Sequence, residues 1–246
     1  MTALIGLLLT ATLSRAPLHA TAGSAAPVVT ASAPAAGATA TADDVVSHVQ
    51  QFYAGINQVT AEFVQSVHNA EFGTDKTSKG TVWLMKPGLM RWDYLEAKGG
   101  VTKVKSSFIA NGATLYVIEH QNKQIIKKNL QASVMPAAVS FLYGKGDLRA
   151  EFDAALDPKS GYGGAGDVVL KLTPKQPSAQ YKNLYLVVDP QQFRVKESIV
   201  VDSSNNVNHF QFNSPDFKTA IEQTRFQFDE RSLPSYQLID GDKPIK

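Results

Sequence analysis

The side chains most able to perform acid–base or metal chemistry near neutral pH are the histidines, and this chain has five of them: His19, His48, His68, His120 and His209. Their spacing contains no His-x-x-x-His pair, and acidic residues do not cluster beside them, so the sequence predicts no zinc site. It contains no Gly-x-Ser-x-Gly elbow for a nucleophilic serine. The chain also has no cysteine, which excludes disulfides, thiolate metal ligands and cysteine nucleophiles. We therefore predict that the protein is not an enzyme and that it uses no cofactor or metal.

Two further polar motifs have structural explanations. Gly161-Tyr162-Gly163-Gly164 is rich in glycine, but no Lys-Ser or Lys-Thr follows, so it predicts a loose turn rather than a phosphate loop. Asp43-Asp44 is better explained as the N-cap of a helix than as a catalytic pair of carboxylates. The net charge of +2 is far from the basic excess of a nucleic-acid-binding protein.

The stretch around which the rest of the chain is arranged is residues 80–94, which contains both tryptophans of the chain. Strand alternation places Val82, Leu84 and Lys86 on one face. It places Met90, Trp92 and Tyr94 on one face of the next strand, and Pro87-Gly88 predicts a turn between the two. One interpretation is an ordinary hairpin that contributes aromatic side chains to a core. The other is the wall of a lipid-sized cavity with one amine at its rim, and the pattern alone leaves both open.

The elements that position this hairpin are mostly strands. Asp43-Asp44 and an apolar stripe predict a helix ending near Gly55, the stripe being Val45, Val49, Phe52 and Ile56. Alternation predicts strands at 60–67, 108–110, 115–118, 123–128, 168–172, 184–189, 194–202, 207–212 and 225–228, with a hairpin turn at Asn111-Gly112. Many strands at short spacing predict a mainly β fold, an antiparallel sheet curled into an unclosed half β-barrel.

Residues 130–156 interrupt the strands with a helical pattern. Val134, Met135, Ala138, Phe141 and Leu142 are spaced for one short helix, and Leu148, Phe152 and Leu156 suggest a second short helical piece. Such helices could simply cover an open end of the sheet, or they could form a movable lid over a hydrophobic cavity. The sequence does not decide between these alternatives.

The composition divides the chain into four parts. Residues 1–20 contain a short apolar run with a small-x-small ending and predict a signal peptide, although no Lys or Arg precedes the run. Residues 21–42 are rich in Ala, Pro and Thr and predict a flexible linker. Residues 43–236 form the predicted folded domain, and residues 237–246 a polar C-terminal tail. The signal peptide predicts export.

Several motifs together resemble the periplasmic outer-membrane lipoprotein carriers, the LolA-like family. They lie in order from about Asp43 to Asp229: Ala61-Glu62-Phe63-Val64-Gln65, Gly80, Lys86-Pro87-Gly88-Leu89-Met90-Arg91-Trp92, Asn111-Gly112 before Leu115-Tyr116, Leu172-Thr173-Pro174-Lys175, and Phe226-Gln227-Phe228. The hairpin motif is the most specific of them. Three features depart from the family pattern. Lys86 replaces an arginine, Met90 replaces a phenylalanine, and the Pro-x-Gly after the last strand is missing from 229–232.

The resemblance implies a half-barrel with a helical lid over a hydrophobic cavity. It implies a monomeric periplasmic carrier, or chaperone, that binds the acyl chains of lipoproteins. Its partners would be acylated lipoproteins, an inner-membrane lipoprotein-releasing ABC transporter and an outer-membrane lipoprotein acceptor, with no nucleic acid. Lys86 would then act as the lid latch, donating to carbonyls of the lid helices around Met135 to Tyr143. An alternative from another class is a periplasmic regulatory domain that senses lipoprotein or misfolded protein with the same half-barrel.

Strand alternation and the lid assignment together give a predicted set of cavity-lining residues for acyl chains. The set is Val82, Leu84, Met90, Trp92, Tyr94, Phe108, Leu115, Val117, Phe141 and Leu142.

Overall fold

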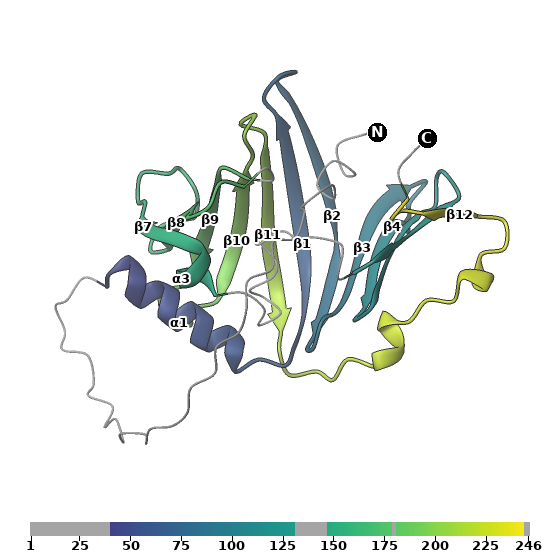
Figure 1. Cartoon of the computed structure of the whole chain (residues 1–246), viewed down its shortest axis with the longest axis horizontal. Coiled ribbons are helices and arrows are strands. Elements are labelled where there is room, and N and C mark those ends of the chain that lie inside the picture. The colour runs from purple at the N-terminus through teal and green to yellow at the C-terminus, as the bar shows by residue number, and fades with distance from the viewer. Residues whose placement is uncertain (1–39, 131–146, 179–180, 244–246) are drawn as a thin grey trace.

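The computed structural model describes residues 40–130, 147–178 and 181–243 (Figure 1). Its elements are α1 Ala42–Ala54, β1 Gln58–Asn69, β2 Thr74–Met85, β3 Leu89–Lys98, β4 Val101–Asn111, β5 Thr114–Glu119, β6 Gln124–Asn129, α3 Leu148–Glu151, β7 Phe152–Leu156, β8 Val168–Pro174, β9 Asn183–Val188, β10 Val195–Val201, β11 Val207–Asp216, η2 Gln223–Phe226, η3 Glu230–Ser232 and β12 Gln237–Asp240. The first predicted lid helix, around 134–142, lies outside the described residues.

The twelve strands of the described residues belong to one sheet, in the order β12-β6-β5-β4-β3-β2-β1-β11-β10-β9-β8-β7. Neighbouring strands are antiparallel throughout, except that β12 pairs parallel with β6. β1 lies near the middle of the sheet because it pairs with both β2 and the distant β11. The two outermost strands, β12 and β7, leave the sheet open. The prediction of a mainly β fold with an unclosed sheet is therefore confirmed.

Three irregularities in strand pairing help the sheet to bend. The register shifts between Thr60 and Glu62 on β1, between Tyr94 and Leu95 on β3, and between Val195 and Glu197 on β10. An extra residue on one strand bends that strand and increases its local twist. Figure 1 shows the result, in which the strands of the two outer thirds fan away from the central β1 and β2.

We call the side of the sheet that packs against α1 the inner face. Pairing registers place side chains of six strands on this face in rows, such as Ala61-Val82-Trp92-Phe108-Val117-Ile126. Apolar side chains of β8, β9 and β10 join the same buried cluster, together with Val45, Val46 and Val49 of α1. One core therefore runs across the inner face from β5 to β8.

Helix α1 begins at Ala42, two residues earlier than an N-cap at Asp43 would place it. Its N-cap is Thr41 rather than Asp43 or Asp44, and Asp44 occupies the third position of a capping box. The Asp44 amide donates to Thr41 Oγ1 at 3.2 Å, while the Thr41 amide donates to Asp44 Oδ2 at 3.0 Å. This reciprocal arrangement satisfies two otherwise unpaired backbone donors. The predicted stripe is largely correct, with Val45 and Val49 fully buried and Phe52 packed at the edge of the core.

The capping box predicts a pH dependence at the start of α1. The hydrogen bonds from Thr41 hold the pKa of Asp44 below its ordinary value of 3.8. A carboxylate with a lowered pKa stabilises the fold above pH 3.8 and loses that contribution as the pH falls through its folded-state pKa. An NMR titration should place the Asp44 midpoint below 3.8. In Thr41→Ala the midpoint should rise toward that value, because the hydroxyl is lost while the backbone amide of residue 41 still donates. An unchanged midpoint would show that the Thr41 hydroxyl makes no such contact.

The C-terminal segment corrects two predictions. Residues 225–228 are not a strand, because η2 covers Gln223–Phe226 and packs its buried Phe226 against the outer face. The predicted polar tail is not wholly free, since β12 extends the sheet beside β6. Between them, Phe228, Leu233 and Tyr236 cover the outer-face residues of β4, β5 and β6. Figure 1 shows this yellow segment crossing from β11 to the opposite edge of the sheet. The apolar residues of this segment are few and irregularly spaced, so no periodic pattern predicted that they would pack on the outer face of the sheet.

The second predicted helical piece, 148–156, is also partly wrong. Only Leu148–Glu151 is helical, capped by Asp147, and Phe152–Leu156 forms the edge strand β7. Leu148 and Phe152 are nevertheless buried in the main core, as their apolar character predicts. Leu156 pairs with Leu170 and completes the edge of the sheet.

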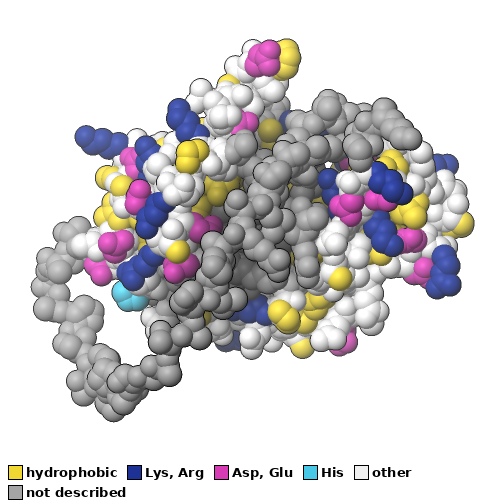
Figure 2. Space-filling model, viewed as in Figure 1, with side chains coloured by type: hydrophobic (Ala, Val, Ile, Leu, Met, Phe, Trp, Pro, Cys, Tyr) yellow, Lys and Arg dark blue, Asp and Glu magenta, His cyan; other side chains and the backbone are white. Residues whose placement is uncertain are grey.

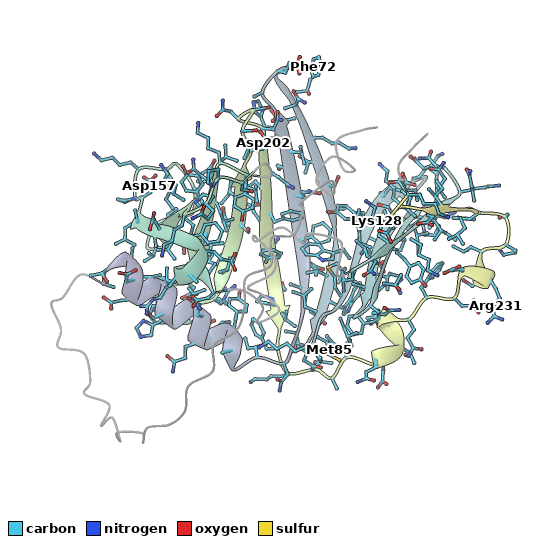
Figure 3. All side chains as sticks on the ribbon, viewed as in Figure 1. Phe72, Met85, Lys128, Asp157, Asp202 and Arg231 are labelled. Atoms are coloured by element: carbon cyan, nitrogen blue, oxygen red, sulfur yellow. The ribbon has the colours of Figure 1, made fainter. Side chains whose placement is uncertain are left out.

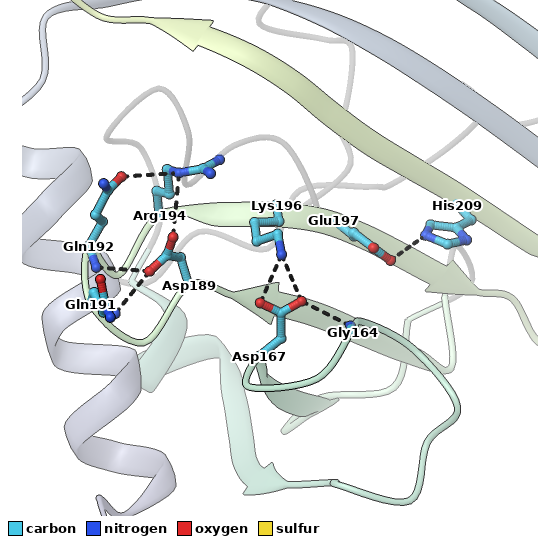
Figure 4. Close-up of polar contacts among 9 residues, drawn as sticks. All are labelled: Gly164, Asp167, Asp189, Gln191, Gln192, Arg194, Lys196, Glu197 and His209. Carbon is cyan, nitrogen blue, oxygen red and sulfur yellow. Dashed lines mark hydrogen bonds and ion pairs between the residues drawn. The ribbon is translucent and has the colours of Figure 1, made fainter.

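The glycine-rich turn at 161–164 is held by a carboxylate of the chain itself (Figure 4). The Gly164 amide donates to Asp167 Oδ2 at 2.9 Å, and Lys196 Nζ lies 2.8 Å from both carboxylate oxygens. Burial acts to raise the pKa of Asp167, but Lys196 and Gly164 outweigh it and keep the pKa below its ordinary value. The turn is thus a structural element, as predicted.

Figures 2 and 3 show the exposed features of the molecule. On the face seen in Figure 2, side chains of both charge signs are interspersed along the two sides, in keeping with the net charge of +2. Figure 3 places Phe72, which is 71% exposed, at the tip of the projecting β1–β2 hairpin. No helix in the described parts of the chain is long and apolar enough to cross a bilayer.

Candidate functional site

The inner face brings most of the predicted cavity residues together. Seven of them are buried in one cluster with α1, and Phe108 packs against that cluster: the seven are Val82, Leu84, Met90, Trp92, Tyr94, Leu115 and Val117. Trp92 is 6% exposed, so the predicted register of the hairpin is confirmed. Phe141 and Leu142 lie outside the described residues.

The centre of this face is occupied by six aromatic rings that we call the aromatic cluster: Phe63, Trp92, Tyr94, Phe108, Phe210 and Phe212. The Phe63 ring lies 5.0 Å from Trp92 and 4.9 Å from Tyr94, both in edge-to-face arrangements. Trp92 also meets Phe210 at 5.3 Å. Such packing is favourable, yet aromatic and methionine side chains can rearrange around another apolar body.

Three members of the aromatic cluster were absent from the sequence-based set: Phe63, Phe210 and Phe212. Alternation correctly predicted strands at Phe63 and at 207–212. Their contribution depends on the pairing of β1 with β11, which sets Phe63 opposite Phe212 although the two are far apart in the chain. Sequence spacing alone does not reveal such a pairing. The available signal was that two alternating segments far apart in the chain each contain two aromatic residues, Trp92 and Tyr94 in one and Phe210 and Phe212 in the other.

Lys86, the predicted latch, contacts the C-terminal end of α1. Its Nζ donates to the carbonyl oxygen of Tyr53 at 2.6 Å and to that of Ala54 at 3.2 Å. The last turn of α1 contains no basic residue of its own. A cation at this position interacts favourably with the negative end of the helix and with carbonyls that lack partners within the helix. The predicted partners at Met135 to Tyr143 lie outside the described residues.

A small pocket lies beside this contact. It is lined by Ile56, Asn57, Gln58, Val59, Leu84, Met85 and Lys86, where the connection from α1 enters β1 next to the end of β2. The Lys86 amide donates to the Asn57 carbonyl at 2.8 Å and fixes the backbone at this point. Two predicted site residues, Leu84 and Lys86, therefore meet at the place where α1 joins the sheet.

The Arg91-Trp92-Asp93 motif serves both faces of the sheet. Trp92 points inward, whereas Arg91 Nε lies 3.0 Å from both carboxylate oxygens of Asp93 on the outer face. Ser107 donates to the same carboxylate at 2.6 Å. Arg91 also donates to the Arg225 carbonyl at 3.3 Å and so anchors η2. This ion pair stabilises the hairpin and the covering segment from the outer face.

The histidines take structural roles where their contacts are known. His209 pairs with Glu197 at 2.8 Å on β11 and β10 (Figure 4), and His68 pairs with Asp75 across the β1–β2 hairpin at 2.8 Å. Among the described residues, no group of three or more histidine, cysteine or acidic side chains could hold a metal ion.

An unclosed β-sheet with an aromatic, apolar inner face and a helix held across it defines a half-barrel binding protein. More particularly, the chain belongs to the family described as "Outer membrane lipoprotein carrier protein LolA", whose model matches residues 54–229. This confirms the resemblance of the motifs. The description of the family names a carrier rather than an enzyme, in agreement with the expectation for this chain.

Relatives and solved structures extend the comparison. An "Outer-membrane lipoprotein carrier protein" of Cupriavidus necator is 27% identical over 139 residues, which cover 55% of this chain and 61% of that protein. One from Ralstonia nicotianae is 26% identical over 167 residues, or 65% of this chain and 71% of that protein. An uncharacterised conserved protein of Thermus thermophilus has the same fold at a TM-score of 0.50 and 10% identity, covering 81% of this chain and 98% of that one.

Proposed function

We propose that this protein is a periplasmic carrier that binds the acyl chains of lipoproteins on its inner face and transfers them from the inner to the outer membrane. The observation that carries the proposal is the aromatic cluster of a chain that belongs to the LolA family, combined with the contact from Lys86 to α1. The predicted signal peptide agrees with a periplasmic location. A lipoprotein-releasing transporter in the inner membrane and an acceptor in the outer membrane would be its partners.

The physical basis is the transfer of acyl chains from water to an apolar face. Burial contributes roughly 0.8 kcal/mol per methylene, so several chains on an open apolar face would bind too tightly for delivery. In the described structure the face is instead filled by its own rings, including Trp92 and Phe210. Cargo must displace these contacts and the helix above them. That cost reduces the net affinity to a range in which an acceptor can remove the cargo.

Co-purification tests the proposal directly. The full chain is expressed in a Gram-negative host, isolated from the periplasm and examined by mass spectrometry for bound acylated lipoprotein. We expect such lipoprotein in the purified fraction and its transfer to outer-membrane vesicles. A lipid-free protein that forms a stable complex with a regulator, and that transfers nothing, would instead indicate a sensor.

Met90→Glu tests the site on the inner face. Met90 is buried beside Leu84 and Ala110 at the end of the hairpin nearest Lys86. A carboxylate there would lie against the acyl chains, and its desolvation is unfavourable. We expect several-fold weaker binding of a fluorescent acyl probe, measured by titration. Ala97→Glu, a charge added at an exposed position of the same strand β3, is the control and should bind normally. Equal binding by both variants would remove Met90 from the site.

A further inference from the structure

Buried polar side chains also lie among the apolar residues of the inner face, and Gln65 is one of them. Gln65 of β1 is 3% exposed and follows Phe63 by two residues, so it points to the same side of the sheet. Its backbone partner across the strands is Phe210 of the aromatic cluster. The residues that lie beside it on the inner face are Ser78 of β2 and Asn208 of β11. Gln65 thus marks the border between the aromatic cluster and a more polar end of this face.

The amide of Gln65 is only half satisfied. Its Nε2 donates to Asn208 Oδ1 at 2.8 Å, which fixes the orientation of the amide plane. Its Oε1 is buried, and within the described chain no group donates a hydrogen bond to it. A buried acceptor without a donor destabilises a fold, and native proteins contain few of them. Leucine would fill the position without this cost, so the orphaned oxygen requires an explanation.

The Gln65 Oε1 atom is a hydrogen-bond acceptor, so the group that would satisfy it must be a hydrogen-bond donor. In an acylated lipoprotein, the acyl chains meet at an N-terminal cysteine, where the ester and thioether groups can only accept hydrogen bonds. The N-acyl amide joins one chain to this cysteine and has an N–H. The acyl chains of a glycerolipid, by contrast, are joined only through esters. Gln65 Oε1 is therefore suited to distinguish an amide-linked chain from an ester-linked one.

We propose that Gln65 is a specificity-determining residue that accepts a hydrogen bond from the N-acyl amide of the cargo while the chains lie against the aromatic cluster. The inference rests on the proposed function. Asn208 holds the amide of Gln65 so that the oxygen stays available, and the buried position shields the new hydrogen bond from water.

Two synthetic probes test this role on the purified full chain. The first is a peptide with an N-terminal tripalmitoyl-S-glyceryl cysteine. The second is the same peptide with an ester oxygen in place of the N-acyl nitrogen, which keeps the chains and removes the donor. The wild-type protein should bind the amide probe about two- to tenfold more tightly than the ester probe, the effect of one net hydrogen bond. Gln65→Leu should bind both probes equally well.

The control is Gln211→Leu, the same substitution at an exposed position of β11 next to Phe210. It should keep the wild-type preference for the amide probe. Equal binding of the two probes by the wild-type protein, or an unchanged preference in Gln65→Leu, would overturn the role of Gln65 and leave the carrier function standing. Failure to bind either probe would overturn the carrier function itself. Comparing the affinities of the wild-type protein for the amide and ester probes needs no variant. This comparison therefore tests the preference for an amide-linked chain even if Gln65→Leu folds poorly.

Discussion

Replacing Lys86 with leucine is expected to leave lipoprotein bound to the carrier, with loading retained and delivery reduced at least tenfold. Lys86 Nζ is the cation that joins the end of β2 to the Tyr53 and Ala54 carbonyls at the end of α1. Hydrogen bonds from a charged donor contribute roughly 1.5–3 kcal/mol when shielded, and each 1.4 kcal/mol changes an equilibrium about tenfold. Because Lys86 is half-buried, the lower end of this range applies.

The direction of the effect follows from which state the contact stabilises. In the described structure α1 is packed on the inner face and the aromatic cluster fills that face, an arrangement that acyl chains would have to displace. Losing the contact removes stabilisation from this packed arrangement. The cargo-bound state then becomes favoured, and transfer to an acceptor becomes unfavourable by the same factor.

Transfer of radiolabelled or tagged lipoprotein from the carrier to outer-membrane vesicles measures the effect. Lys79→Leu, the same substitution at an exposed position of the same strand, is the control and should deliver normally. Lys86→Arg keeps the charge and adds donors, so delivery should be largely retained. Delivery by Lys86→Leu at the normal rate would show that the contact with α1 does not control release.

The strands and the faces of their side chains could be predicted from the sequence because alternation is a local property. The inward orientation of Trp92, Val82 and Leu84 followed from the spacing around Pro87-Gly88 alone. Asn111-Gly112 likewise gave the β4–β5 hairpin, where Gly112 has a φ of 94°. Each of these features depends on residues within a few positions of one another.

Features that depend on distant pairing could not be predicted in this way. The joining of β1 to β11 brings Phe63 beside Phe210, and the return of β12 to β6 turns an apparent tail into a strand. The partner of Lys86 is a second example. The sequence predicted an amine at this end of the strand, but the carbonyls that it meets in the described structure belong to α1, whose packing on the sheet is a tertiary property.

Residues distant in the sequence leave no room for a side chain at position 80, so only glycine fits there. Gly80→Ala is therefore expected to destabilise the protein by about 3 kcal/mol or more. A Cβ at this position would lie 2.0 Å from the Asp93 carbonyl oxygen and 2.7 Å from two atoms of the Phe63 ring. Both neighbours are confined, since Asp93 belongs to the ladder of β2 and β3 and the Phe63 ring is held by Trp92 and Tyr94. The strand and the aromatic cluster must shift together to admit one methyl group.

Urea unfolding measures the change in the free energy of unfolding. Gly164→Ala is the matched control, because a Cβ there meets only Asp167 Oδ2 at an ordinary 3.6 Å, and its unfolding free energy should change by less than about 1 kcal/mol. A similarly small change in Gly80→Ala would mean that the Phe63 ring moves aside readily. The aromatic cluster would then be loose enough to admit acyl chains without a large rearrangement, and control of cargo binding would fall to α1 and Lys86.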